Sequence, residues 1–302
     1  MNGRAYAWLT LALGAAFAAP ARADLYYLVV AGLGGEPKYQ EQFDKATTEI
    51  AAVARQTTGN DRVIVLQGES ATRAAVVKAF GSLRTRTKPT DSLAVVLVGH
   101  GSFDGDVYKF NLPGPDIDGT ELQRLLGAVP AKSQLVVDAT SASGAVLDWA
   151  SDNRVVITAT RSGFERNATR FPELFAAALA EGAADINKNG IITAQEAFDY
   201  ASRSVAESFT KQGTLATEHP QIKGSGAARF TVARLNAPTA APSSPEVAAL
   251  TTERERLDGE IEALKGQREQ MSADAYLDQL QKLLVQLAEV QGKIDAAQGK
   301  PQ

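Results

Sequence analysis

The chain has 302 residues, 44% of them hydrophobic and 22% charged, which suits one large domain with an appendage, or two domains. Its formal net charge is −4 and it contains no basic run, so nucleic acid is not an expected partner. The absence of cysteine excludes a thiolate nucleophile, a disulfide framework and a lipidated N-terminal cysteine.

Residues 1–23 have the pattern of a signal peptide. Arg4 supplies the positive start, an apolar stretch follows, and "ARA" before Asp24 fits the small-residue cleavage rule. The apolar run is too short for a membrane span, and no later segment replaces it. Its removal takes two basic residues, Arg4 and Arg22, from 31, which leaves 29 against 35 acidic residues and a net charge of −6. We expect an exported protein, periplasmic or secreted; the alternative is an uncleaved N-terminal anchor.

Five apolar runs, nearly continuous in Val, Leu and Ile, predict strands that are covered on both faces, as in a parallel sheet. They span residues 25–33, 61–68, 91–99, 133–139 and 153–160. Helical patterns lie between them at 36–56 and at 70–84, the second with Ser70 as its expected N-cap. A more alternating run at 227–235 predicts a last strand at a sheet edge. This order predicts an α/β domain with right-handed crossovers and a mostly parallel sheet of about six strands.

The Pro/Ala/Ser-rich segment 236–245 predicts a linker at a domain boundary, and residues 246–297 beyond it predict two amphipathic helices that fold back as a hairpin or coiled coil. The first apolar seam comprises Val247, Leu250, Arg254, Leu257, Ile261, Leu264, Arg268 and Met271. The second comprises Leu277, Leu280, Leu284, Leu287, Gln291 and Ile294, widened by Tyr276, Leu283 and Val290. Apolar seams need a partner surface, which is the other helix, a second copy of the chain or another protein.

Two predicted strands end in residues that can carry chemistry, and sites in open α/β sheets lie beyond the carboxyl ends of the strands. The strand at 91–99 leads into Gly99-His100-Gly101, and the strand at 133–139 leads into "TSASG", residues 140–144. Flanking glycines allow a ligand to approach His100 closely. A histidine that is satisfied within its own loop is the alternative.

"VLVGHGS" followed one strand later by "VVDATSASGA" resembles the caspase-type peptidases, nearest to the legumain branch. Members of this family place a histidine in an H-G motif and a cysteine in a C-x-S-G motif. The resemblance covers roughly residues 24–235 and puts Ser141 at the cysteine position. It implies a caspase-like fold and hydrolase chemistry, with His100 as general base, Ser141 as nucleophile, and backbone N–H groups of Gly101 and Ser141 as the oxyanion hole.

A serine at this position leaves three interpretations open. A serine hydroxyl is a weak nucleophile that needs a base held by a third group, and Asp138, Asp104 and Asp106 are the nearby acids in sequence. Ser141 is therefore an active serine in a rebuilt site, or it marks a pseudoenzyme that lost turnover and kept peptide or protein binding. The third interpretation is a simple helix entry capped by Ser141 or Ser143. We favour the second.

"DINKNGIITAQE", residues 185–196, fits the calcium loop of the EF-hand. The expected calcium ligands are Asp185, Asn187, Asn189, the Ile191 carbonyl, Thr193 and the bidentate Glu196. Gly190 supplies the sharp turn. The alternative is that Thr193 to Glu196 form only a capping box for the next helix, but a capping box does not require the preceding Asp, Asn and Gly residues. A lone EF-hand loop is expected to act as a structural clip within the domain.

Arg161 and Glu165 follow the strand at 153–160 and are candidates for lining a substrate pocket, or for a local ion pair on a surface loop. His219 precedes a proline turn and is expected to be structural. No phosphate loop or zinc motif is present.

The expected function is an exported, calcium-binding protein of caspase-like fold that binds a peptide or protein with little or no turnover. An active His100–Ser141 peptidase and a coiled-coil assembly scaffold are the alternatives, with homo-oligomers formed through the C-terminal helices.

Overall fold

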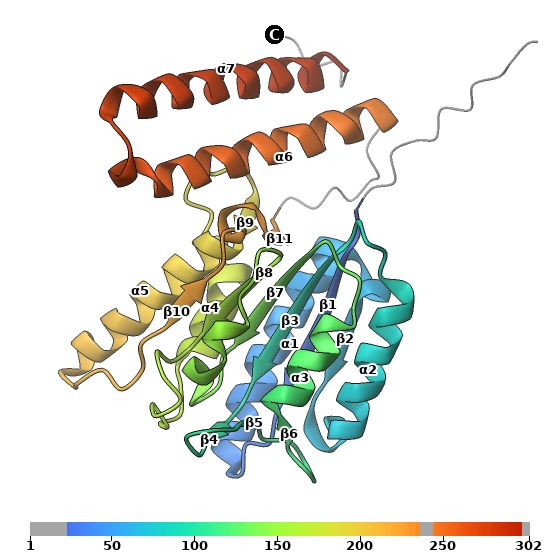
Figure 1. Ribbon diagram of the computed structural model, residues 1–302, viewed down its shortest axis with the longest axis vertical. Helices are drawn as coiled ribbons and strands as arrows, with labels where there is room; N and C mark the ends of the chain where they lie inside the picture. The colour runs from blue at the N-terminus through green and yellow to red at the C-terminus, as the bar shows by residue number, and fades with distance from the viewer. Residues whose placement is uncertain (1–22, 236–243, 298–302) are drawn as a thin grey trace, which may run out of the picture.

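A six-stranded sheet forms the centre of the molecule, with the strand order β10-β8-β7-β3-β1-β2 (Figure 1). The computed structural model describes residues 23–235 and 244–297, so the expected signal peptide and most of the expected linker lie outside the described residues. All neighbouring strands are parallel except β10, which is antiparallel to β8. The strands are β1 (Leu25–Ala31), β2 (Val63–Leu66), β3 (Ser92–Val98), β7 (Ser133–Asp138), β8 (Arg154–Thr158) and β10 (Gln221–Lys223).

Helices cover both faces of this sheet, and this explains the continuous apolar runs. On one face lie α1 (Pro37–Thr58), α4 (Phe171–Ala180) and α5 (Ala194–Gln212), and on the other lie α2 (Arg73–Arg86) and α3 (Gly119–Gly127). Along β1, Tyr27 and Val29 pack into the first core layer, whereas Leu28 and Val30 pack into the second. The predicted mostly parallel α/β architecture is therefore confirmed.

One local prediction was wrong, and another was right only in part. Thr72, not Ser70, caps α2, because Thr72 Oγ1 accepts a hydrogen bond from the Ala75 N–H, whereas Ser70 lies in a preceding 3₁₀ turn. The run 227–235 supplies β11 (Thr231–Arg234), which pairs with β9 (Ile191–Thr193) outside the main sheet. The antiparallel edge of the main sheet is instead β10, a strand too short to leave a pattern in the sequence.

A second small sheet follows His100 directly. It consists of β4 (Gly101–Phe103), β5 (Tyr108–Phe110) and β6 (Ile117–Asp118), all antiparallel, and it extends the structure beyond the carboxyl ends of the central strands. Tyr108, Phe110 and Ile117 are buried under α3 and the sheet. The residues after β3 are thus held by packing rather than forming an open loop.

The C-terminal residues form the predicted helical hairpin, which lies at the opposite end of the sheet from β4–β6 (Figure 1). It comprises α6 (Pro245–Gly266) and α7 (Ala273–Ala297). Leu257 packs with Val290 and Ile294, and Leu250, Leu283 and Leu287 complete the contact. Of the residues predicted for the second seam, Leu277 and Leu284 are exposed, whereas Leu283, Leu287, Val290 and Ile294 face the hairpin interface as predicted. Among the residues that the structure describes, no helix is long and apolar enough to cross a membrane.

Candidate functional sites

His100 and Ser141 both lie at the carboxyl edge of the sheet, but their side chains have different surroundings. The His100 ring meets Tyr39 and Phe43 of α1 edge-on, with ring centroids 5.0 Å away in each case. Burial lowers the pKa of His100, against the opposing effects of Gly34 and Glu36. The ring is therefore neutral at neutral pH and packs as part of the α1 interface.

The Ser141 hydroxyl is engaged by the backbone of Gly101. Ser141 Oγ donates to the Gly101 carbonyl at 3.0 Å and accepts from the Gly101 N–H at 3.2 Å. Ser141 is only 2% exposed. Within residues 23–235 and 244–297, no hydrogen bond joins the His100 ring to this hydroxyl. The Gly101 N–H, expected in an oxyanion hole, is used here to bind Ser141 itself.

A loop covers the segment that carries Ser141. Ala142 adopts a left-handed backbone (φ 60°), and its N–H donates to the Glu165 carbonyl at 2.8 Å. Residue 144 must be glycine, because a Cβ there would lie 2.1 Å from the Ser162 nitrogen and 2.4 Å from the Arg161 carbonyl carbon. The backbone of residues 161–165 therefore rests directly on residues 142–144 and excludes solvent from Ser141.

Asp138 and Asp104, two acids near Ser141 and His100 respectively in the sequence, form hydrogen bonds with other groups. Asp138 is fully buried, and its Oδ1 accepts from the Thr140 hydroxyl at 2.7 Å, while Thr140 also contacts the Tyr108 hydroxyl at 2.9 Å. Burial raises the pKa of Asp138 to about 6. Asp104 accepts from the N–H groups of Asp106 and Val107 in a turn. None of these contacts supplies the third group of a serine triad.

The helix-entry interpretation of residues 140–144 holds for the helix but not for the serine cap. A 3₁₀ helix does follow (Ser143–Trp149), but it begins after Ala142 without any side-chain cap. Ser143 Oγ instead lies 3.2 Å from Thr160 Oγ1 at the end of β8. The small residues are needed because the loop after β8 packs against this segment.

Arg161 and Glu165 form the local ion pair that was the alternative to a substrate pocket, with Arg161 Nε 3.0 Å from Glu165 Oε1. The same carboxylate oxygen lies 2.6 Å from His219 Nδ1, a contact that the sequence did not indicate. Next to it, buried Glu218 accepts from the backbone N–H groups of Arg170 and Phe171 at the start of α4, both at 2.8 Å. Burial raises the pKa of Glu218 to about 7.

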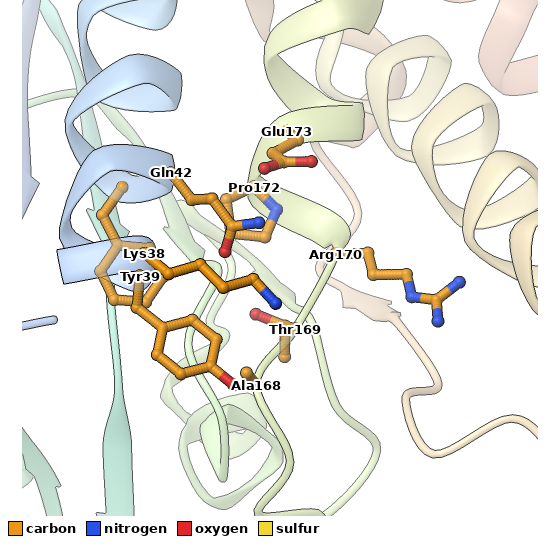
Figure 2. Close-up of a pocket in the computed structure, with 9 residues that line it drawn as sticks. Lys38, Tyr39, Gln42, Ala168, Thr169, Arg170, Pro172 and Glu173 are labelled. Atoms are coloured by element: carbon orange, nitrogen blue, oxygen red, sulfur yellow. The ribbon is translucent and has the colours of Figure 1, made fainter. Parts of the chain in front are cut away.

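A pocket of about 210 Å³ lies between α1 and the start of α4, beside the aromatic side chains that contact His100 (Figure 2). Its lining residues are Lys38, Tyr39, Gln42, Phe43, Ala168, Thr169, Arg170, Pro172 and Glu173. Lys38 and Gln42 reach in from α1, while Arg170 points away toward α5. Thr169 is fixed by a hydrogen bond to the Ala139 carbonyl at the end of β7. The pocket is therefore anchored to the same sheet edge as Ser141.

The predicted calcium loop lies between α4 and α5, near the hairpin. Asp185, 4% exposed, accepts hydrogen bonds from the N–H groups of Asn189 and Gly190 at 3.1 and 3.0 Å. Asn189 Oδ1 accepts from the Ile191 N–H at 2.8 Å. Gly190 turns the chain with φ +80°. These contacts wrap the loop around the Asp185 carboxylate, as the short side chains of Asp and Asn favour.

Glu196 closes the loop and also forms the capping box. Its Oε2 accepts from the Thr193 N–H at 3.0 Å and from the Thr193 hydroxyl at 2.9 Å. Its Oε1 is buried and has no hydrogen-bond partner, in a side chain that is 5% exposed. Burial raises the pKa of Glu196, and the charges of Glu262 and Asp185 add to the effect against the Thr193 hydrogen bonds. The capping box therefore uses one carboxylate oxygen and leaves the other without a partner.

The loop is braced by β11, which pairs with β9 in antiparallel register, from Thr231 opposite Thr193 to Arg234 opposite Ile191. Among residues 23–235 and 244–297, no three His, Cys, Asp or Glu side chains are placed to hold a metal ion. The loop offers only two carboxylates, and amide, hydroxyl and main-chain oxygens supply its other potential ligands, which is the EF-hand pattern. The donor set fits a hard cation such as calcium.

Comparison with solved structures finds distant likenesses. Protein GSU0716 from Geobacter sulfurreducens is similar with a TM-score of 0.46 and 13% identity, over 66% of this chain and 92% of that one. The caspase drICE is similar with a TM-score of 0.42 and 10% identity, over 67% of this chain and 88% of that one. No protein-family model matches the chain, and no curated protein matches its sequence.

Proposed function

We propose that the protein binds one calcium ion in the loop of residues 185–196. The carrying observation is Glu196 Oε1, a buried carboxylate oxygen without a partner in a loop that otherwise satisfies its polar groups. Buried polar atoms are rarely left unpaired, and a buried carboxylate is costly unless a cation or donor faces it. The proposed ligands are Asp185, Asn187, Asn189, the Ile191 carbonyl, Thr193 and Glu196.

The ion has a structural role in this proposal. It joins the end of α4, the β9–β11 pair and the start of α5, where Asp185 and Glu196 otherwise repel each other. Because only two loop carboxylates are ligands, we expect a dissociation constant of about 10⁻⁴–10⁻³ M, the range of extracellular calcium modules. This affinity agrees with the proposed export of the chain, since calcium is abundant outside cells.

Thermal unfolding in calcium and in EGTA tests the site. At about 10 mM calcium we expect the wild-type Tm to rise by about 3–8 °C, because a ligand that binds only the folded state stabilises it. Glu196→Gln should abolish the rise, although glutamine still completes a capping box. Glu181→Gln, on the surface at the end of α4, is the control and should respond like the wild type. Equal responses in all three proteins would exclude the loop as the binding site.

The second candidate function is recognition of a peptide segment at the carboxyl edge of the sheet without hydrolysis. The observation for binding is the pocket at this edge, and the observation against hydrolysis is the Ser141 hydroxyl, which is buried and hydrogen-bonded in both directions to Gly101. A serine nucleophile must be deprotonated by a base and must reach the substrate carbonyl. The pocket beside Tyr39 and Phe43, with Lys38 and Glu173 on its rim, is the proposed place of contact.

A fluorophosphonate probe tests for a working serine. We expect no labelling of Ser141 in the wild-type protein, read out by peptide mapping. The chain has no cysteine, so Ser141→Cys also gives a single thiol, which should react with iodoacetamide at least tenfold more slowly than the thiol of Ser102→Cys on the exposed face of β4. Probe labelling of wild-type Ser141 that disappears in Ser141→Ala would establish an active hydrolase instead.

A further inference from the structure

Helix α6 of the C-terminal hairpin crosses directly over the calcium loop and its supporting turn. Gly259 is buried where α6 meets residues 227–229, since a Cβ there would lie 3.0 Å from Arg229 Cγ and 3.4 Å from the Ala228 carbonyl oxygen. Leu257 and Ile261 are buried on either side of it. This close crossing brings two acidic residues, Asp258 and Glu262, over the loop.

Asp258 and Glu262 are one helical turn apart and so lie on the same face of α6. Glu262 Oε1 accepts from Asn187 Nδ2 at 3.4 Å. The Asn189 side chain acts on the Asp258 carboxylate and lowers its pKa, against the larger effect of burial, which raises it. These two asparagines occupy the third and fifth positions of the loop, where an EF-hand requires an oxygen ligand. Glu262 therefore contacts one proposed calcium ligand, and Asp258 interacts with a second.

The chemistry of these contacts fixes the orientation of both amides. A carboxylate only accepts hydrogen bonds, so it must face the NH₂ end of an asparagine amide. The oxygen atoms of the two amides have the partners that this orientation requires. Asn187 Oδ1 accepts from the Asn189 N–H at 3.1 Å, and Asn189 Oδ1 accepts from the Ile191 N–H inside the loop. Both amide oxygens thus face the backbone of the loop.

The two helix carboxylates also add negative charge around the site. Lys265 Nζ lies 2.7 Å from Glu262, and Arg254 acts on Asp258 from the same helix, so this charge is partly balanced. No group of three acidic side chains within the described residues is close enough to share one ion, which places Asp258 and Glu262 behind the ligands rather than among them. Groups in such positions orient the ligands and strengthen metal binding.

We propose that calcium binding in the loop and docking of the C-terminal hairpin are coupled, with Asp258 and Glu262 as positioning residues. This inference rests on the proposed calcium site. Docked α6 presets the two amide oxygens and so raises calcium affinity. By linkage, bound calcium strengthens the docking of α6 to the domain by the same factor. The hairpin is then held firmly when calcium is present and less firmly when it is absent.

The test uses full-length protein with the double variant Asp258→Ala/Glu262→Ala. The control is Glu253→Ala/Glu260→Ala, which removes the same charge from partly exposed positions of α6 that pair with Arg256. We expect calorimetry to show calcium affinity about tenfold lower in the first variant and nearly unchanged in the control. Asp258→Asn/Glu262→Gln keeps an acceptor for each amide and should recover part of the loss.

Hydrogen exchange provides the second measurement. Calcium should slow amide exchange in residues 255–264 of the wild type and of the control, and should have little effect there in Asp258→Ala/Glu262→Ala.

Wild-type protein that binds no calcium would refute the calcium site itself. Wild-type binding with equal affinity in both double variants and no calcium effect on α6 exchange would leave the site intact and overturn the coupling. If the alanine variant does not fold, the Asn/Gln variant carries the same comparison, with an expected affinity loss of about threefold.

Discussion

Gly144→Ala should destabilise the protein by about 3 kcal/mol or more, among the largest effects expected of a single methyl group. The added Cβ would lie 2.1 Å from the Ser162 nitrogen and 2.4 Å from the Arg161 carbonyl carbon. Both are backbone atoms, so no side-chain rotation relieves the clash. The loop of residues 161–165 must move off residues 142–144, or the chain must unfold.

Chemical denaturation of Gly144→Ala and of Gly81→Ala measures this effect. Gly81 lies within α2, and a Cβ there meets no atom within 4 Å. Its replacement should stabilise the protein by about 1 kcal/mol, because alanine is the better helix former. A Gly144→Ala protein as stable as the wild type would show that the loop does not rest on the Ser141 segment.

Asp138→Asn should change how the stability of the protein depends on pH. Burial raises the pKa of Asp138 to about 6, whereas the carboxyl ionises near its ordinary 3.8 in the unfolded chain. Between pH 3.8 and about pH 6, Asp138 is therefore protonated in the folded protein but ionised in the unfolded chain. The stabilisation is therefore complete below pH 3.8 and is lost as the pH rises through 6, with a total change of up to about 3 kcal/mol.

The difference between the two proteins isolates this group. The asparagine side chain cannot ionise, so the free energy of unfolding of Asp138→Asn, relative to the wild type, should increase by up to about 3 kcal/mol from about pH 4 to about pH 8. Glu218, with a pKa of about 7, also makes the free energy of unfolding fall as the pH rises, and His100, with a lowered pKa, makes it rise. Both effects are the same in the two proteins and cancel in the difference. A difference that does not vary with pH would mean that the pKa of Asp138 is the same in the folded and the unfolded protein.

The central sheet could be predicted from the sequence because each of its five parallel strands is covered on both faces. The runs at 25–33 and 91–99 contain almost no polar interruption, and β1 and β3 lie within them. Helix α1 likewise presents Phe43 and Ile50 at helical spacing to the core. These signals are local, since burial on a regular element imposes a period or a continuous apolar run.

The short elements escaped prediction because nothing local defines them. Strands β4, β5 and β10 have three residues each, which is too few for a pattern, and each depends on a partner strand for its hydrogen bonds. The predicted seam of α7 was too wide for a related reason. Leucines occur on two of its faces, and only packing against α6 selects Leu283 and Leu287 over Leu277 and Leu284.

The candidate sites were predictable to different extents. The proposed calcium loop is contiguous, so the spacing from Asp185 to Glu196 was sufficient to propose it. The surroundings of Ser141 depend on residues 161–165 and on the hydrogen bonds to Gly101, which join segments far apart in the chain. The contact of Glu262 with Asn187 spans 75 residues, and no property of either helix seam indicates it. The contacts of His219 and Glu218 arise in the same way.

Calorimetric titration of calcium into the full-length protein is the most direct measurement of the central claim, the calcium site of residues 185–196. We expect one ion per chain, with binding unaffected by equimolar magnesium, because the proposed ligands are all oxygen atoms in the EF-hand arrangement, which suits the larger ion. Glu196→Gln should show no heat of binding beyond dilution. No binding to the wild-type protein at millimolar calcium, or undiminished binding to Glu196→Gln, would contradict the proposed function.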